Sequence, residues 1–517
     1  MGSPIFILGE DAHRTRGRDA QQSNITAGKA VAEAVRTTLG PRGMDKMLVD
    51  SSGTVVITND GATILDEMDI EHPAAQMLVE VADTQEEAVG DGTTTASVLA
   101  GQVLVRAEDL LSQNVHPTTI AEGYSQARDI ALAAIDDLVI DGEMDDELLH
   151  QVVRTSMTGK GTGHLSADAL AEHVVAAIRR VEDETGVERD DVRVHTQVGA
   201  SSGATELVEG VVVEGEPLRD DMPKTVEDAT IAVLNAKLQH RETSADVEYN
   251  ITDVGQLDEA LAAEEHELQG YADALAAAGV DVLVATKDVD DRVAAFLSKR
   301  GILAFDGVGT SDARAIACAT GSKTLGDVRD IEADDLGFAE RVRTQSYGDD
   351  DLFFVEGGAD AESVTLFVRG GTEHVIDELE RALGDALDVA TVAITHGGVV
   401  PGAGMTEIRV ADAVREAAAG IEGRAQLAVE AFAEALEVIP RTLAENTGMD
   451  PIDALVDLRA ANESGNAGVV SEGETGTIAD PLELGIVDPA EVKREAIESA
   501  TEAATMIVRI DDVIAAE

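Results

Sequence analysis

Hydrophobic positions in the first third of the chain recur with the period of a helix. Val31, Val35 and Leu39, for example, follow at four-residue intervals, which places them on one helix face. Four such stretches are separated by short loops: 27–40, 73–89, 93–112 and 117–140. Residues 47–65 switch to a strand-like period around Ser-Ser-Gly and Asn-Asp-Gly turns, which predicts a hairpin. Residues 20–150 are therefore predicted to be mostly helical.

The middle of the chain has the pattern of an alternating α/β unit. Residues 190–235 are glycine-rich and strand-like, and a helix with a leucine stripe follows at 256–278. The apolar runs at 280–286 and 301–306 predict buried parallel strands, with a helix between them.

The last part of the chain returns to helical patterns. A strand leads into a long helix at 373–394, and further helical stretches cover 404–464 and 490–504. The final apolar run, 506–514, is strand-like. This order, helical, then α/β, then helical, predicts a discontinuous domain built from both ends of the chain, with an α/β domain inserted.

The balance of charges excludes two classes of function. Lys and Arg number 38 against 101 Asp and Glu, a formal net charge of −63. Coating nucleic acid, or binding an anionic membrane surface, needs a basic face. Hydrophobic residues make up 44% of the chain and recur periodically, which is not typical of a disordered acidic protein.

The acidic excess resembles the proteins of salt-loving microbes. Only nine of the 38 basic residues are lysines, and the carboxylates are spread along the chain. At multimolar salt the Debye length falls to about 3 Å or less, which screens the self-repulsion. We interpret the charge as a solvated acidic surface; binding of a basic partner is the alternative.

The single cysteine and the lack of a long apolar run fit an expected location in a reducing cytoplasm. Cys318 alone excludes an intrachain disulfide and a cysteine-based metal cluster, and its helix-like surroundings predict a buried small side chain. No run of 18 apolar residues is present, and the start of the sequence does not match a signal peptide.

One motif has the chemistry of a phosphate site. The sequence GDGTTT (90–95) opens a predicted helix, where backbone N–H groups favour phosphate oxygens. The hydroxyls of Thr93, Thr94 and Thr95 add donors, and Asp91 offers the hard oxygen ligand that Mg²⁺ prefers. The alternative is an ordinary helix cap formed by an Asp or Thr after a glycine turn.

Two further glycine turns and two carboxylates could complete such a site. The turns are Leu39-Gly40-Pro41 and Gly402-Ala403-Gly404, and the carboxylates are Asp60 and Asp385. Phosphoryl hydrolysis needs a metal clamp and groups that orient the attacking water. Sequence spacing alone does not say whether these residues converge.

A serine hydrolase is a weaker candidate. Gly199-Ala200-Ser201-Ser202-Gly203 matches GxSxG, but a nucleophile elbow turns from a strand into a helix. Here the motif runs toward another strand-like stretch, so a loop is the favoured interpretation. The sequence contains no HExxH motif, so a zinc hydrolase is an equally weak candidate.

The chain resembles a group II chaperonin subunit, of the archaeal thermosome and eukaryotic cytosolic chaperonin type. The resembling stretches run in family order over nearly the whole chain: 38–50, 57–65, 71–78, 89–101, 113–124, 222–238, 368–387, 443–455 and 509–514. Together with the acidic bias, they suggest a haloarchaeal member.

The resemblance implies a multi-domain α and α/β fold with three domains. A mostly helical equatorial ATP-binding domain would comprise 1–145 and 402–517, and a small α/β intermediate hinge domain 146–213 and 365–401. An α/β apical domain, 214–364, would bind substrate and carry a helical lid protrusion at about 243–270. Subunits, identical or mixed, would form a double ring with eight or nine per ring, a cage that folds unfolded proteins.

The resemblance also implies roles for the site residues, with ATP, Mg²⁺ and possible K⁺ as cofactors. Asp60 and Asp385 would position the attacking water, and Asp91 would bind Mg²⁺. The remaining nucleotide-binding positions would be Leu39, Gly40, Pro41, Gly92, Thr93, Thr94, Thr95, Lys160, Gly404 and Asp488. Lys160 would reach the γ-phosphate, Gly404 would lie by the adenosine and Asp488 near the ribose.

The sequence departs from the family pattern at two places. The loop 467–480 lacks the aromatic and Asn residues frequent at the adenine pocket, and Pro401 replaces a small residue. The alternative function is a passive holdase or ring scaffold that does not hydrolyse ATP. Such a subunit is expected to lose one of Asp60, Asp91 and Asp385, and all three are present.

Overall fold

The structure is a computed structural model. It describes residues 13–49, 51–140, 142–161, 166–182, 186–240, 254–348, 350–358, 363–473 and 475–515. The chain divides into two compact units, each with its own core. Unit 1 comprises residues 1–175 and 377–517, and unit 2 comprises residues 176–376. The fold is thus multi-domain, largely helical and mixed with sheets, while the boundaries of three domains stay a prediction.

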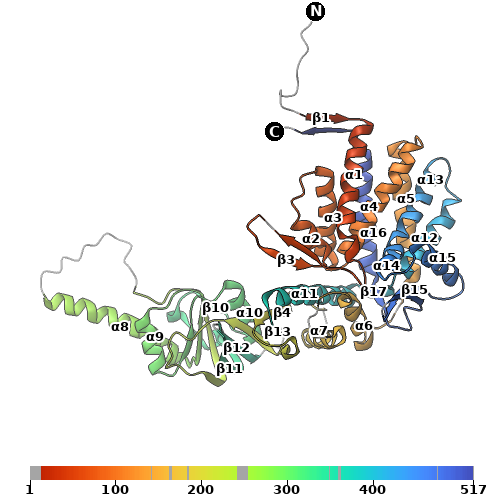
Figure 1. Ribbon diagram of the computed structural model, residues 1–517. Helices are drawn as coiled ribbons and strands as arrows, with labels where there is room; N and C mark the ends of the chain where they lie inside the picture. The colour runs from red at the N-terminus through yellow and green to blue at the C-terminus, as the bar shows by residue number, and fades with distance from the viewer. Residues whose placement is uncertain are drawn as a thin grey trace, which may run out of the picture. The chain divides into compact units, whose positions relative to one another are not determined.

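The core of unit 1 is a layer of helices contributed by both ends of the sequence. Helix α4 lies at its centre and packs against α1, α3, α13 and α16 (Figure 1). The main helices are α1 (Arg18–Val35), α3 (Pro73–Val89), α4 (Thr93–Ser112), α5 (Pro117–Leu138), α12 (Met405–Ala418), α13 (Ala425–Leu436) and α16 (Ala490–Arg509). Leu104, Phe432 and Ile507, from three of them, are fully buried in one cluster. The predicted helical stretches are confirmed, because their apolar stripes meet here.

Shorter elements surround this layer. The predicted hairpin is confirmed by the antiparallel strands β2 and β3, although the Asn-Asp-Gly turn after it begins a short helix, α2. The elements are α2 (Gly61–Asp66), α6 (Asp146–Met157), α14 (Val438–Asn446), α15 (Pro451–Asn462), β2 (Lys46–Val49), β3 (Val55–Thr58), β14 (Val399–Pro401), β15 (Gly468–Glu472), β16 (Thr475–Ala479) and β17 (Val487–Pro489). Two helices cross the sequence boundary between the units, α7 (Ala167–Val181) and α11 (Glu373–His396).

The terminal segments of the described chain pair with each other. Strand β1 (His13–Arg16) runs antiparallel to β18 (Asp512–Ala515), and the two lie side by side in Figure 1. The expected strand at 506–514 is wrong in its first half, because α16 continues to Arg509. Ile507 and Val508 are fully buried, so packing outweighs the strand preference of this apolar run.

Unit 2 is built around a mixed sheet, seven-stranded among the described residues, with the strand order β6-β12-β11-β7-β8-β9 and β10 beside β7. As predicted, β8 and β9 are parallel and the helix α9 connects them; β7 is also parallel to β8, to which α8 connects it. The elements are β6 (Gly210–Glu214), β7 (Thr225–Leu234), α8 (Val254–Ala278), β8 (Val282–Ala285), α9 (Asp291–Lys299), β9 (Leu303–Phe305), α10 (Thr310–Thr320), β10 (Thr324–Leu325), β11 (Gly337–Tyr347) and β12 (Asp350–Gly358). A separate small sheet contains β4 (Val192–Val198), β5 (Glu206–Val208) and β13 (Val364–Gly370) in the order β4-β13-β5.

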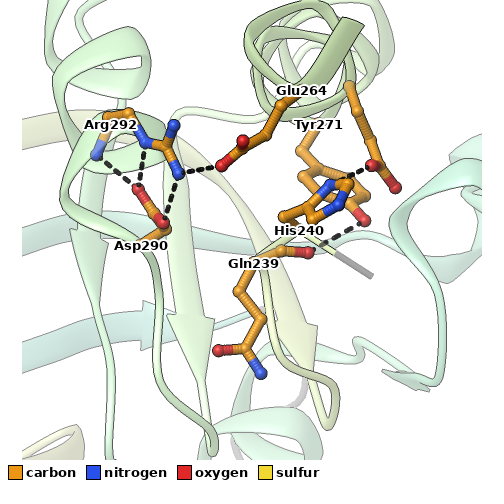
Figure 2. A network of polar contacts seen from close by, with 7 residues as sticks. Gln239, His240, Glu264, Tyr271, Asp290 and Arg292 are labelled. Atoms are coloured by element: carbon orange, nitrogen blue, oxygen red, sulfur yellow. Dashed lines mark hydrogen bonds and ion pairs between the residues drawn. The ribbon is translucent and has the colours of Figure 1, made fainter. Parts of the chain in front are cut away.

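Helix α8 is held to unit 2 by its second half. Leu268 and Leu275 are fully buried, whereas Leu261 is 52% exposed. Polar contacts join the middle of α8 to the rest of the unit: Arg292 donates to Glu264 over 2.7 Å (Figure 2), and His240 lies 2.8 Å from Glu267. The predicted lid protrusion falls partly on residues 241–253, which lie outside the described residues, and its role stays a prediction.

The prediction for Cys318 is wrong, because its side chain is exposed. On α10 the neighbours Ile316, Ala317 and Ala319 are buried, and Cys318 falls on the outward stripe with Ser311 and Arg314. Within the described residues, none of the helices combines the length and the apolar character needed to cross a membrane.

Candidate functional site

A cavity of about 450 Å³ opens in unit 1 where several loops and helix starts meet. Twelve of the residues singled out in the sequence line it: Leu39, Gly40, Pro41, Asp60, Asp91, Gly92, Thr93, Thr94, Thr95, Lys160, Gly404 and Asp488. They come from distant parts of the sequence, so the fold brings together what spacing alone left open. The size is that of a small-molecule site.

The start of α4 forms one wall of the cavity. Gly92 is its N-cap residue, with a φ of 84°, and no side chain caps the helix. The alternative of an Asp or Thr cap is therefore not what the structure contains. The first N–H groups of α4 lack that side-chain partner, an arrangement that suits an anion. Thr94 Oγ1 lies 3.2 Å from Thr38 Oγ1, which fixes one of the three threonines.

The Asn-Asp-Gly turn packs directly on the start of α4. Asp60 caps α2 by accepting from the Thr63 N–H over 2.7 Å, and it accepts from Thr93 Oγ1 over 3.1 Å. A Cβ at Gly61 would lie 2.7 Å from the Thr94 nitrogen, so glycine permits this close approach. The turn therefore sets the Asp60 carboxylate beside the threonines of α4.

Lys160 joins the cavity to the remaining predicted residue, Asp385. The two form an ion pair, and their side chains are 14% and 9% exposed. Asp385 lies on α11 and is not among the cavity-lining residues, but belongs to the same unit. Beside Lys160, Gly159 has a φ of 92°, and its carbonyl accepts from the Asn59 amide over 2.6 Å.

Burial and neighbouring carboxylates raise the pKa values of two acidic groups around Lys160. Burial, opposed by Lys160 and reinforced by Asp60, raises the pKa of Asp385 to about 7. Burial together with the charges of Asp385 and Asp60 raises the pKa of Glu86, on α3, to about 9. Burial alone would lower the pKa of Lys160, but the attraction of Asp385 and Asp91 outweighs it and raises the pKa. The site therefore concentrates negative charge, which a bound cation would offset.

A second buried lysine lines the cavity. Lys493, on α16, lines the cavity and lies 2.9 Å from both Asp488 on β17 and Glu407 on α12. Burial alone would lower the pKa of Lys493. The attraction of the two carboxylates outweighs the effect of burial, so the pKa is raised. Sequence reasoning missed Lys493 and Glu407, although the closeness of Lys493 to the Val-Asp-Pro stretch was a usable signal.

The residues fit a nucleotide with a divalent cation. Three features support this: an uncapped helix start, carboxylates on two adjacent turns and one hydroxyl without a partner among the described residues. Ser156 Oγ lines the cavity, is buried and has no hydrogen-bond partner among the described residues. Mg²⁺ takes carboxylate and phosphate oxygens. Asp91 and Asp60 are the carboxylates beside the α4 start that could hold it.

A hairpin closes another side of the cavity. Strands β15 and β16 pair antiparallel, and Val469, Val470 and Ser471 line the cavity. Arg42, in the LGPRG turn, donates to Ser471 Oγ over 3.2 Å and ties the hairpin to that turn. The sequence left the adenine contacts of 467–480 in doubt, and here its apolar residues form a wall.

The serine hydrolase reading is wrong on geometry. Strand β4 is followed by a single 3₁₀ turn, Ser202–Ala204, and then by β5, so no helix follows the motif. Ser201, the serine at the nucleophile position, is exposed and caps this turn by accepting from the Gly203 N–H, so it lies in a connecting loop, as favoured from the sequence.

Comparison with known proteins shows the family of the chain. Residues 31–517 match the TCP-1/cpn60 chaperonin family. The chain is 67% identical to thermosome subunit 3 of Haloferax volcanii, over 100% of this chain and 99% of that one. It is 53% identical to thermosome subunit 1 of the same organism and 52% identical to thermosome subunit alpha of Halobacterium salinarum, covering 100% of this chain and 92% of each relative. With these matches across its whole length, the chain belongs to the TCP-1/cpn60 chaperonin family, as a group II chaperonin.

Proposed function

We propose that this chaperonin binds ATP with Mg²⁺ in the cavity of unit 1 and hydrolyses it to drive the folding of other proteins in the cytoplasm. The observation that carries the proposal is the convergence of Asp60, Asp91 and the α4 threonines on one cavity, with Asp385 behind Lys160. The three relatives named above come from two salt-loving organisms, which supports the interpretation of the acidic surface.

Each group has a distinct task in the proposed hydrolysis. The N–H groups at the start of α4 and the threonine hydroxyls hold phosphate oxygens, and Lys160 donates to the terminal phosphate. Mg²⁺, held by Asp91, supplies charge neutralisation when bound. Asp60 and Asp385 orient a water molecule and accept its proton.

We further propose that subunits assemble into a double ring of eight or nine per ring, whose cage receives unfolded proteins. A separate hinge domain and a lid on α8 would couple hydrolysis to closure, as the family resemblance implies. The exposed Leu261 on α8 supports an apolar surface available to clients. A passive holdase is less well supported, since no acidic residue of the proposed hydrolytic set is missing.

The experiment that tests the proposal is the substitution Asp385→Ala. Asp385 does not line the cavity, so nucleotide binding should be retained within about twofold, while turnover should fall by about 10²-fold or more, as for a lost general base. The measurements are calorimetric binding of ATP and phosphate release in high salt. Wild-type turnover by this variant would contradict the role assigned to Asp385, whereas absence of phosphate release by the wild-type protein would favour the holdase.

A further inference from the structure

The buried cluster of Lys493, Asp488 and Glu407 has a feature that the proposed catalysis does not use. Two acidic side chains share one ammonium group, at 2.9 Å each, and the side chains of Lys493, Glu407 and Asp488 are 13%, 6% and 20% exposed. A buried ion cluster of this kind costs desolvation energy, so its presence is weak evidence for a stabilising role.

The three residues lie on three separate elements that meet at the cavity wall. Asp488 is in the short strand β17, where it pairs with Val400 of β14. Glu407 is in the first turn of α12, directly after Gly404, and Lys493 is in the first turns of α16. Lys493 and Asp488 line the cavity, whereas Glu407 does not. Glu407 therefore holds the lysine from behind.

The contacts orient the Asp488 carboxylate. Its Oδ2 atom is taken by Lys493, and a Cβ at Gly402 would lie 3.2 Å from the same atom, so glycine leaves room for it. With Oδ2 engaged, Oδ1 is the acceptor left for a group in the cavity. Because Lys493 is fixed by Glu407, the carboxylate is held in place before a ligand arrives.

A buried lysine at this position is unusual in a chain that contains few lysines. The chain has nine lysines against 29 arginines, and two of the nine, Lys160 and Lys493, are buried at this one cavity. A compact ammonium can bond two carboxylates on different elements, which the planar fork of arginine does with different geometry.

We propose that Lys493, anchored by Glu407, is a positioning residue that fixes Asp488 to accept a hydrogen bond from the sugar hydroxyls of the nucleotide. This inference rests on the proposed nucleotide site and adds a determinant of selection for ribose. Lys493 does not act on the phosphates; its effect is confined to the sugar.

The test compares binding of ADP and of 2′,3′-dideoxy-ADP, which lacks both hydroxyls, by calorimetry in high salt. The double substitution Lys493→Met with Glu407→Gln removes one positive and one negative charge, so the net charge of the cluster is unchanged. It should weaken ADP binding about tenfold, the scale of one charge-assisted hydrogen bond, and change dideoxy-ADP binding by less than about twofold. Adding Asp488→Asn to this variant should cause no further loss of ADP affinity.

A matched control is Arg459→Met. Arg459 pairs with Glu437, which is 1% exposed, in the same unit, and neither residue lines the cavity. The control removes a partner from a buried ion cluster, and should leave the affinities for both nucleotides unchanged. Melting temperatures without nucleotide report how far each variant is destabilised.

Equal loss of affinity for ADP and dideoxy-ADP, or no loss for either, would overturn the positioning role while the proposed function stands. Failure of the wild-type protein to bind ADP at all would overturn both. If the double variant does not fold, Lys493→Arg serves instead, because it keeps the charge and changes the geometry. It should also reduce the preference for ADP, and an unchanged preference would contradict the proposal.

Discussion

Two opposing effects act on the carboxyl group of Asp385, which is buried and paired with Lys160. Burial favours the neutral acid, while the ammonium favours the carboxylate, and the pKa of Asp385 settles at about 7. Such a value lies near neutral pH, where a carboxylate that accepts a proton from water is most effective. The surroundings of Asp385 therefore suit the base role proposed for it.

A pH profile follows from this raised pKa. Because only the ionised form accepts a proton, kcat for ATP hydrolysis should fall as the pH falls through 7, to about a tenth of its plateau at pH 6. Measuring the rate of phosphate release between pH 5.5 and 8.5 gives this profile. ADP binding over the same range is the control, since Asp385 does not line the cavity. A flat kcat profile would exclude this role for Asp385.

At this scale, local motifs could be predicted and long-range partners could not. Asp91 and Thr93 were identified because a glycine turn before a helix carries its own signal. Lys493 and Glu407 were missed because the distinguishing contact joins residues 86 positions apart in sequence. Cys318 was misplaced because its apolar neighbours hide which helix face turns outward.

Among the elements, α8 carries one apolar stripe that is buried along part of the helix and exposed along another part. Its second half packs into the unit 2 core, with Leu268 fully buried, while Leu261, two turns earlier, is half exposed. The sequence pattern predicted the stripe over the whole helix. It could not predict where the sheet beneath the helix ends, because that depends on β7 and β8.

We expect Leu268→Ala to destabilise unit 2 by about 2–5 kcal/mol, because it removes a buried side chain and leaves a cavity. Leu261→Ala is the matched control, the same change on the exposed part of the same helix, and should cost less than about 0.5 kcal/mol. Denaturant unfolding monitored by circular dichroism measures both. Equal effects would show that α8 is not anchored as described.

For the whole molecule, the acidic charge is distributed unevenly. Residues 11–50 carry seven basic and five acidic groups, a local charge of +2 within a chain of −63. This stretch leads into the LGPRG turn at the cavity. The rest of the surface must be hydrated and screened for copies of the chain to approach each other.

The proposed ring should therefore fall apart when salt is removed. At about 0.1 M salt the Debye length is about 10 Å, and repulsion between subunits is no longer screened. Electron microscopy and size-exclusion chromatography before and after dialysis measure the change, and restoring salt, but not sucrose, should restore the ring. A ring that survives dialysis without Mg²⁺ or ATP would rule this out.

The pairing of β1 with β18, and of α4 with α16, has a consequence for synthesis. Unit 2 is continuous in sequence, so its core is complete once residue 376 has left the ribosome. Unit 1 needs α16, which ends at Arg509, to cover α4. The helices of unit 1 that are synthesised first therefore keep an apolar face exposed while unit 2 is synthesised. This chaperonin is itself, for most of its translation, an unfinished protein in need of protection.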